Sequence, residues 1–242
     1  MTSIRANVPA VADEVPWYDL IDDVPEPPED GMQQYDTIIY ILAILGARYA
    51  HDPNVLVAGS AVFIVYDSAT PGSVIAPDGF VVFGVPERLI KRIRRLYRIE
   101  EWGPPPAFVL EVGSDSTAGR DMREKREIYA RMGGREYWRF DPSGGERYGE
   151  PLIGERLVDG EYERFETRVE ADGDVWARSE ALGVDFYWRV GSDGYGEFLV
   201  RDSETGEWLG DLSEERAARL AAEARAQELE AELERLRRSA GE

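Results

Sequence analysis

Two acidic residues could do chemistry because of where they stand in the chain. Glu111 lies within Phe108 to Val112, a short apolar run that predicts a buried strand. A carboxylate there must meet a metal ion or a cationic side chain, because its desolvation is otherwise costly. Asp78 follows Pro77 and precedes the apolar run 80–83, so we expect it at the start of a strand or in the bend before it.

Both acids also have ordinary explanations. A glutamate at a strand edge often serves only in a salt bridge, and Pro-Asp-Gly is a good turn sequence. Asp78 therefore gains significance only together with Glu111 and a third group. Strand alternation would place Glu111 on the face opposite Leu110 and Val112.

One lysine is informative because lysine is so rare in this chain. The sequence has 26 arginines and only two lysines, Lys91 and Lys125. A compact ammonium can approach a phosphate or a water in ways that a planar guanidinium cannot, although a chance surface lysine is the alternative. Helical spacing places Asp121, Lys125 and Tyr129 on one face of the helix expected after Glu111.

The composition limits which metals and nucleophiles the chain can use. There is no cysteine and only one histidine, His51, so disulfides, thiolate zinc sites and a cysteine nucleophile are excluded. Any metal must be held by oxygen atoms, which favours magnesium, manganese or calcium. No apolar run approaches the roughly 20 residues of a bilayer span, and the first residues lack a signal-peptide pattern. We therefore expect a cytoplasmic location.

The net charge of −20 opposes binding to nucleic acid, because phosphate backbones attract basic surfaces. The basic residues are unevenly distributed, however. Residues 85–139 hold 13 basic and 9 acidic side chains, so this segment is positive in an acidic chain. Its arginines between 88 and 98 could equally form a solvated surface.

The candidate residues stand within a longer stretch that resembles the Uma-two family of proposed restriction endonucleases, in the PD-(D/E)XK nuclease superfamily. The resemblance extends over about residues 31 to 210 and is most specific from 106 to 142. It rests on these segments: Pro77-Asp78-Gly79, Phe108 to Thr117, Asp121 to Lys125, Tyr129, Gly133, Glu136-Tyr137-Trp138 and Asp141-Pro142. It implies a restriction-endonuclease-like α/β fold, a mixed central β-sheet flanked by helices, with the active site at one edge.

The resemblance also implies roles for individual residues. Asp78 matches the first acid of the nuclease motif and Glu111 the second. The usual lysine would fall on Gly113, which cannot serve, and Lys125 on the following helix occupies its place. The expected catalytic residues are therefore Asp78, Glu111 and Lys125, with metal ligands Asp78, Glu111 and the Val112 carbonyl.

The chemistry that follows is hydrolysis of phosphodiester bonds in nucleic acid, with DNA favoured. Magnesium or manganese would polarise the phosphodiester and activate a bound water, while Lys125 would orient that water or stabilise charge in the transition state. Asp121 and Tyr129 would orient the catalytic residues without contacting the metal or the substrate themselves. The family resemblance also suggests that the protein is a homodimer.

The elements that must position these residues can be read from periodicity and turn signals. We expect a helix over 33–49, strands over 55–66, 74–83, 107–112 and 136–140, a hairpin over 157–165 and strands over 184–200. Residues 86–98 predict a basic helix or an irregular crossover. A helix over 118–132 would connect two strands and make at least part of the sheet parallel. Its expected caps are Ser114, Ser116 and Thr117.

Three segments divide the chain. Residues 1–30 are acidic and proline-rich and are expected to form a tail, 31–211 the nuclease-like domain, and 212–242 a charged helix that could form a coiled coil. Two alternatives to a nuclease stay open: a catalytically silent fold that binds nucleic acid, and an assembly module that works through the last helix.

Overall fold

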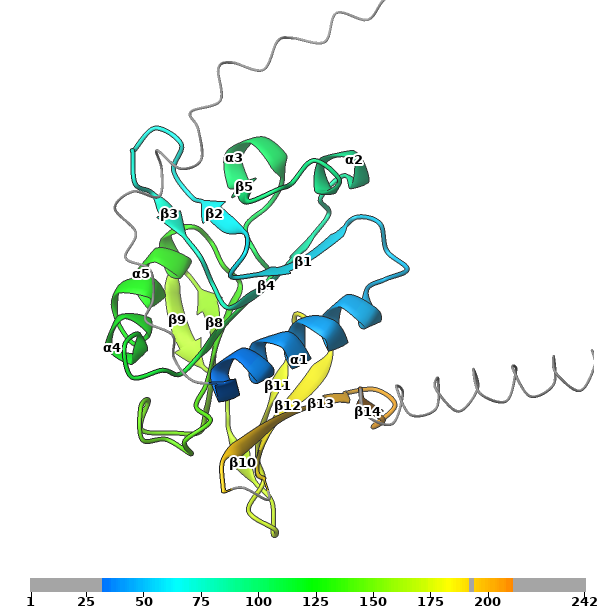
Figure 1. The fold of residues 1–242 in the computed structure, drawn as a ribbon, viewed down its shortest axis with the longest axis vertical. Coiled ribbons are helices and arrows are strands. Elements are labelled where there is room, and N and C mark those ends of the chain that lie inside the picture. The colour runs from blue at the N-terminus through cyan, green and yellow to red at the C-terminus, as the bar shows by residue number, and fades with distance from the viewer. Residues whose placement is uncertain (1–31, 192–193, 211–242) are drawn as a thin grey trace, which may run out of the picture.

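A six-stranded sheet forms the centre of the computed structural model, which describes residues 32–191 and 194–210 (Figure 1). In spatial order its strands are β1 (Val55–Gly59), β4 (Gly79–Phe83), β6 (Phe108–Val112), β7 (Glu136–Phe140), β8 (Leu152–Val158) and β9 (Glu161–Arg164). Strands β6 and β7 pair in parallel, and the other neighbours are antiparallel. The sheet is therefore mixed, with the crossover where the sequence predicts it.

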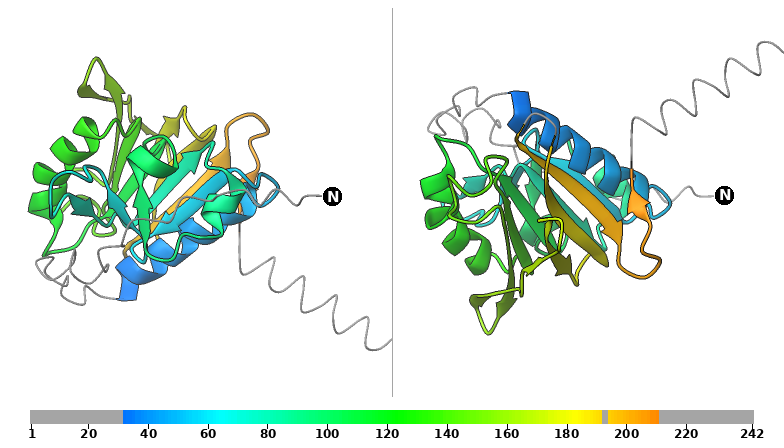
Figure 2. Two further views of the ribbon diagram at one scale, coloured as in Figure 1. Left: turned by 90° about the horizontal axis from the view of Figure 1, so that it is seen from above. Right: turned by 90° about the horizontal axis from the view of Figure 1, so that it is seen from below.

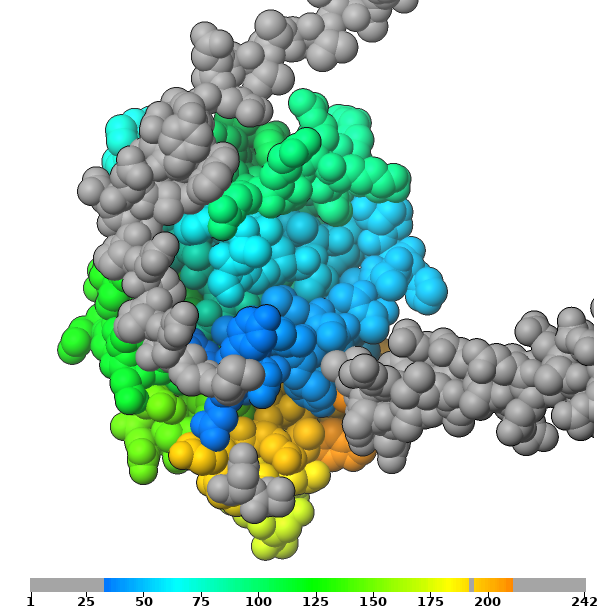
Figure 3. Space-filling view, in the orientation of Figure 1, coloured from blue at the N-terminus to red at the C-terminus, as the bar shows by residue number. Residues whose placement is uncertain are grey.

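One face of this sheet is covered by a helix and by a second sheet. Helix α1 (Met32–Arg48) lies beside an antiparallel sheet of five strands: β10 (Arg168–Val169), β11 (Val175–Ser179), β12 (Val184–Val190), β13 (Gly196–Asp202) and β14 (Trp208–Leu209). Figure 3 shows α1, in blue, between the cyan strands and the yellow and orange strands of the second sheet. Buried side chains from all three elements meet in one core, among them Leu45, Leu110, Trp138 and Phe186.

The opposite face carries short helices and a small sheet. Helices α4 (Ala118–Asp121) and α5 (Glu124–Arg131) pack there, with a three-stranded sheet of β2 (Phe63–Val65), β3 (Val74–Ile75) and β5 (Leu96–Arg98). Helices α2 (Glu87–Ile90) and α3 (Ile99–Trp102) flank β5 in the chain. A second core of Val109, Tyr137, Tyr129 and Tyr97 lies on this side. In Figure 2, α4 and α5 and the second sheet lie on opposite sides of the central strands.

Three predicted elements are interrupted. The strand expected over 74–83 is divided into β3 and β4, because residues 76–78 between them are not in a strand. The helix expected over 118–132 is broken at Arg123, whose backbone angles (φ −130°, ψ −77°) are not helical. The strand expected over 55–66 stops at Gly59, where Val62 N–H donates to the Gly59 carbonyl in a tight turn. Gly59 allows a close approach, because a Cβ there would lie 2.5 Å from the Asp78 carbonyl oxygen. The glycine at the end of β1 therefore lets this strand pack against the bend that carries Asp78.

Other expectations differ in smaller ways. Residues 86–98 form only the single turn of α2, followed by β5, so the basic helix considered there is wrong. The hairpin around Asp159 and Gly160 is confirmed, and both residues have the positive φ values, 50° and 89°, that a two-residue turn requires. The predicted tail 1–30 and the predicted helix 212–242 lie outside the described residues. Within the described part of the chain, no helix is both long and apolar enough to cross a membrane.

Candidate active site

Glu111 is a buried carboxylate near the end of a central strand. Strand alternation turns Leu110 and Val112 toward α1, while Val109 and Glu111 face α5. Only 1% of Glu111 is exposed, and both of its oxygens have partners. The Tyr129 hydroxyl donates to Oε1 at 2.5 Å, and the Lys125 ammonium lies 2.8 Å from Oε2. Glu111 is thus inside the molecule and not in an edge salt bridge.

The electrostatics around Glu111 favour its protonated form. Burial raises its pKa to about 8, the negative charges of Asp121 and Asp78 add to the rise, and Lys125 partly offsets it. Tyr129 is fully buried as well, and burial raises the pKa of its phenol well above the ordinary value. Tyr129 therefore remains a hydrogen-bond donor to the carboxylate.

Lys125 is buried between two carboxylates and is not a surface lysine. Its ammonium lies 2.8 Å from Glu111 Oε2 and 2.8 Å from Asp121 Oδ1. Burial lowers the pKa of Lys125, but the charges of Glu111, Asp121 and Asp78 outweigh this and hold the pKa above its ordinary value. Lys125 is therefore a permanent cation at this place.

Asp121 joins α4 to α5 and holds Lys125 from the second side. It is completely buried, and its Oδ2 accepts hydrogen bonds from the Tyr148 hydroxyl at 2.7 Å and the Thr117 hydroxyl at 3.0 Å. The helical spacing of Asp121, Lys125 and Tyr129 thus brings them together, despite the break at position 123. Thr117 does not cap α4 with its side chain, because its hydroxyl donates to Asp121 instead. That part of the capping prediction is wrong.

Asp78 lies in the bend before β4, next to the end of β6. Its Oδ2 accepts a hydrogen bond from the backbone N–H of Val112 at 2.8 Å. Burial raises its pKa, and the nearby Lys125 lowers it only in part. Because Gly79 pairs with Leu110 in the antiparallel register, Asp78 just before β4 and Glu111 near the end of β6 lie at the same end of two adjacent inner strands.

Sequence reasoning missed two residues that touch this group. The Gln34 side chain, from α1, donates to the Val112 carbonyl at 3.1 Å and also hydrogen-bonds Asp78. It falls one turn before Ile38 on the apolar stripe of α1, and a polar residue on that stripe was a usable signal. Tyr148 comes from the loop between β7 and β8, and no periodicity in the sequence marks it.

The residues present fit a hard divalent cation. Asp78, Glu111 and Val112 offer two carboxylates and a carbonyl oxygen, the donor types that magnesium and manganese prefer. The Lys125 ammonium contacts the buried carboxylates of Glu111 and Asp121, and Asp78 lies close enough for its negative charge to raise the pKa of Glu111, so the local charge favours a further cation. In residues 32–191 and 194–210, no three or more acids or histidines are grouped to form a metal cage. Waters and a phosphate would therefore complete the coordination, as is usual for magnesium.

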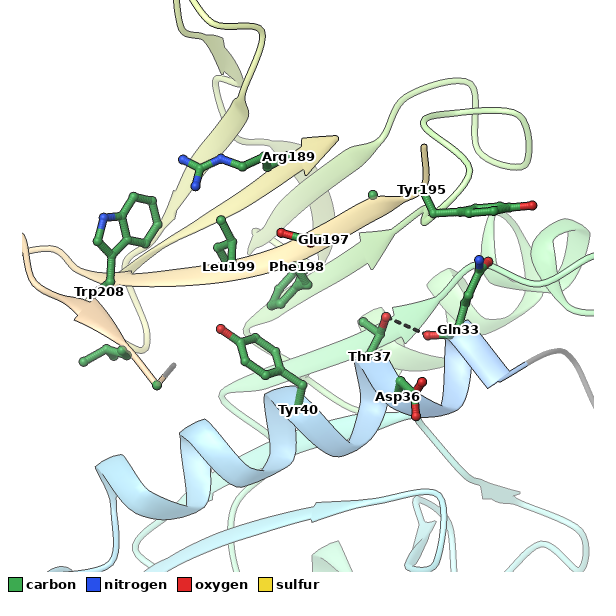
Figure 4. Close-up of a pocket in the computed structure, with 13 residues that line it drawn as sticks. Gln33, Asp36, Thr37, Tyr40, Arg189, Tyr195, Glu197, Phe198, Leu199 and Trp208 are labelled. Atoms are coloured by element: carbon green, nitrogen blue, oxygen red, sulfur yellow. Dashed lines mark hydrogen bonds between the residues drawn. The ribbon is translucent and has the colours of Figure 1, made fainter. Parts of the chain in front are cut away.

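A separate groove lies on the other side of α1. Its volume is about 770 Å³, and residues of α1 and of β13 and β14 line it (Figure 4). Gln33, Thr37 and Tyr40 face Phe198 and neighbours of the second sheet there, with the Thr37 hydroxyl donating to the Gln33 carbonyl at 2.8 Å. None of Asp78, Glu111 or Lys125 lines the groove. The buried acids and the groove are therefore two different places.

The mixed sheet flanked by helices, with acids at the ends of adjacent strands, places the chain in the class of restriction-endonuclease-like α/β proteins. The chain belongs to the Uma2 family, whose model is described as "Putative restriction endonuclease" and matches residues 17–191. A solved structure from Anabaena variabilis, described as a "putative nuclease", is similar to the chain with a TM-score of 0.45 and 12% identity, covering 65% of this chain and 77% of that one. No curated protein matches the chain.

Proposed function

We propose that the chain is a magnesium- or manganese-dependent endonuclease that hydrolyses phosphodiester bonds, with DNA as the favoured substrate. The observation that carries this proposal is the pair of Lys125 and Glu111, whose charged groups lie 2.8 Å apart. Glu111 is on β6, and the neighbouring strand β4 begins directly after Asp78. Membership of the Uma2 family supports nuclease activity in general. The metal, the preference for DNA and the catalytic residues are parts of the proposal.

Asp78, Glu111 and the Val112 carbonyl would hold the cation. Bound there, it would supply Lewis-acid polarisation of a phosphodiester oxygen and a water of lowered pKa. Gln34 holds the Val112 carbonyl from one side, and the Val112 N–H holds Asp78 from the other. These hydrogen bonds fix the oxygens at the strand ends before any substrate arrives, which lowers the cost of organising the site.

Lys125 would act by charge and not as a proton acceptor. Its pKa lies above the ordinary lysine value, so it has no free base to offer near neutral pH. A buried cation beside the scissile phosphate would stabilise the negative charge that grows in the transition state. Tyr129 would keep Glu111 in place through its 2.5 Å hydrogen bond.

The test is cleavage of supercoiled plasmid DNA and of a structured RNA, each with magnesium, with manganese and with a chelator. We expect cleavage of DNA that needs the metal and is lost in Glu111→Gln and in Asp78→Asn. Glu124→Gln is the matched control, since Glu124 is an exposed acid on α5 that pairs with Arg120. Cleavage that survives both site variants would contradict the proposed active site.

A catalytically silent nuclease fold is the second candidate. Lys125 already lies against Glu111 and Asp121, and the net charge of −20 disfavours tight contact with a phosphate backbone. Binding of DNA without cleavage under any metal condition would favour this candidate. The same assay, with a gel-shift measurement on the same samples, separates the two functions.

A further inference from the structure

The loop after β7 is built around a buried aspartate. Asp141 is fully buried, and its Oδ1 accepts the Ser143 N–H at 2.9 Å. Its Oδ2 accepts the N–H groups of Arg147 and Tyr148 at 2.8 and 3.1 Å. One carboxylate thus fixes both ends of the loop. Satisfied buried hydrogen bonds of this kind make a backbone position well defined, so the loop delivers Tyr148 to one place.

The Tyr148 ring occupies the space beside Gly113. A Cβ on Gly113 would lie 3.1 Å from Tyr148 Cε2 and 3.3 Å from Cζ, so a methyl group there would require the ring to shift by a few tenths of an ångström. Position 113 is where the nuclease motif would carry its lysine. In this protein the tyrosine from the loop fills that space, and the cation comes from α5.

The Tyr148 hydroxyl reaches the residue that holds Lys125. It donates to Asp121 Oδ2 at 2.7 Å, while the Lys125 ammonium lies 2.8 Å from Asp121 Oδ1. The two oxygens of one buried carboxylate therefore have two different partners. Because the hydroxyl fixes one oxygen, it also fixes the rotation of the carboxylate and the direction in which the other oxygen meets the ammonium.

We propose that Tyr148 is a positioning residue for Lys125, acting through Asp121. The loop over 141–148 holds Tyr148 in the place where its hydroxyl reaches Asp121. The consequence for turnover rests on the proposed function. The positioning itself does not, because it is a property of the folded protein alone. Without the hydroxyl, Asp121 Oδ2 keeps only Thr117, and the carboxylate gains freedom to turn.

The scarcity of lysine makes a direct measurement feasible. Protein made with carbon-13-labelled lysine contains two labelled residues, Lys125 and the exposed Lys91, whose side chain is 71% accessible. In the wild type we expect two unequal Hε proton shifts at Lys125, the mark of a fixed ammonium, and nearly equal shifts at Lys91. In Tyr148→Phe the Lys125 separation should fall to about half or less, with Lys91 unchanged.

Tyr97→Phe is the matched control, because Tyr97 is another buried tyrosine with one hydrogen bond, to the Pro104 carbonyl at 2.7 Å. It should leave both lysine signals as they are. Gly113→Ala crowds the Tyr148 ring without removing its hydroxyl, so it should change the Lys125 shifts in the same direction. This second variant also covers the case in which Tyr148→Phe fails to fold.

Turnover gives the functional half of the test. If the protein cleaves DNA, Tyr148→Phe should lower kcat by about 10-fold to 100-fold with little change in KM, since misplacement of a catalytic group by about 1 Å has effects of this size. Unchanged Lys125 shifts in both Tyr148→Phe and Gly113→Ala would overturn the proposal. An inactive wild type with altered Lys125 shifts in the variants would overturn the proposed function and leave the positioning role intact.

Discussion

The ammonium of Lys125, on α5, lies 2.8 Å from Oε2 of Glu111, on β6, and both groups are buried. Further negative charge surrounds the pair, because Asp121 and Asp78 lie close enough to raise the pKa of Glu111. A buried ion pair of this kind is weak evidence for stability, since desolvation offsets much of the attraction. A role of this pair in catalysis is therefore a matter for the proposed function and not for stability.

Removing the cation should be costly. In Lys125→Met the carboxylates of Glu111 and Asp121 lose the cation that contacts both of them, and we expect the free energy of unfolding at neutral pH to fall by about 3 to 5 kcal/mol. Urea denaturation monitored by fluorescence measures the change. The double variant Lys125→Met, Asp121→Asn should recover part of the loss, because it removes a buried carboxylate left without the ammonium, whereas the raised pKa of Glu111 lets a proton neutralise that group.

The other lysine supplies the control for this experiment. Lys91 forms an exposed pair with Glu87, and such pairs contribute roughly 0 to 1 kcal/mol. Lys91→Met should therefore change the stability very little. A loss in Lys125→Met no larger than that in Lys91→Met would show that the buried pair has no energetic role.

Stability should fall as the pH rises through the acidic and neutral range. Glu111 has a pKa raised by burial to about 8, against an ordinary value of 4.5, and burial raises the pKa of Asp78 too. Between pH 4.5 and about 8 the folded protein holds a proton on Glu111 that the unfolded chain has lost, so the free energy of unfolding decreases with rising pH. Urea denaturation at several pH values from about 5 to about 8, in metal-free buffer, measures the slope.

Glu111→Gln should flatten this dependence, because glutamine does not titrate. Glu124→Gln should not, since the Arg120 hydrogen bond lowers the pKa of Glu124 and moves its effect to more acidic pH. A slope that is the same in wild type and Glu111→Gln would mean that other groups cause it.

Local patterns predict much of the fold around the site. The apolar run containing Glu111 predicts β6, and strand alternation predicts which way the carboxylate faces. The spacing of Ile38, Ile41 and Leu45 predicts α1. The strand, helix and strand from 107 to 141 predict the parallel pair of β6 and β7. Each of these features depends on a short stretch of sequence, which is why it can be read in advance.

Features that depend on distant partners could not be read in this way. The second sheet has strands with charged outer positions, and Asp185 pairs there with Arg178 and Arg201 of the two neighbouring strands. The sequence shows these charges but not their pairing. The contact of Tyr148 with Asp121 likewise spans a loop whose path is set by Asp141. Nothing in the local pattern indicates where that loop leads.

The oligomeric state stays a prediction. The leucines of the segment 212–242, which lies outside the described residues, have a spacing that suits a coiled coil. We expect light scattering of the full chain to give a dimer or larger, and a truncation ending at Asp211 to give a smaller species. DNA cleavage should survive the truncation, because the proposed active site lies within residues 78–148. A monomer at high concentration of the full chain would contradict the prediction.

Metal binding tests the two acids without any reference to catalysis. Asp78 lies just before β4 and Glu111 lies on the adjacent strand β6, the Val112 N–H donates to Asp78, and the chain has no cysteine and one histidine to compete for the ion. We expect manganese binding by titration calorimetry in the wild type, and at least about 10-fold weaker binding in Glu111→Ala and in Asp78→Asn, because each would remove a proposed ligand. Glu124→Gln removes an acid outside the site and should bind as the wild type does.

Since a bound ion stabilises the folded state by mass action, manganese should also raise the melting temperature of the wild type and of Glu124→Gln but not of Glu111→Ala. Equal manganese affinity in the wild type and Glu111→Ala would remove Glu111 from the metal site, and the carboxylates of Asp78 and Asp121 would then be the next pair to substitute.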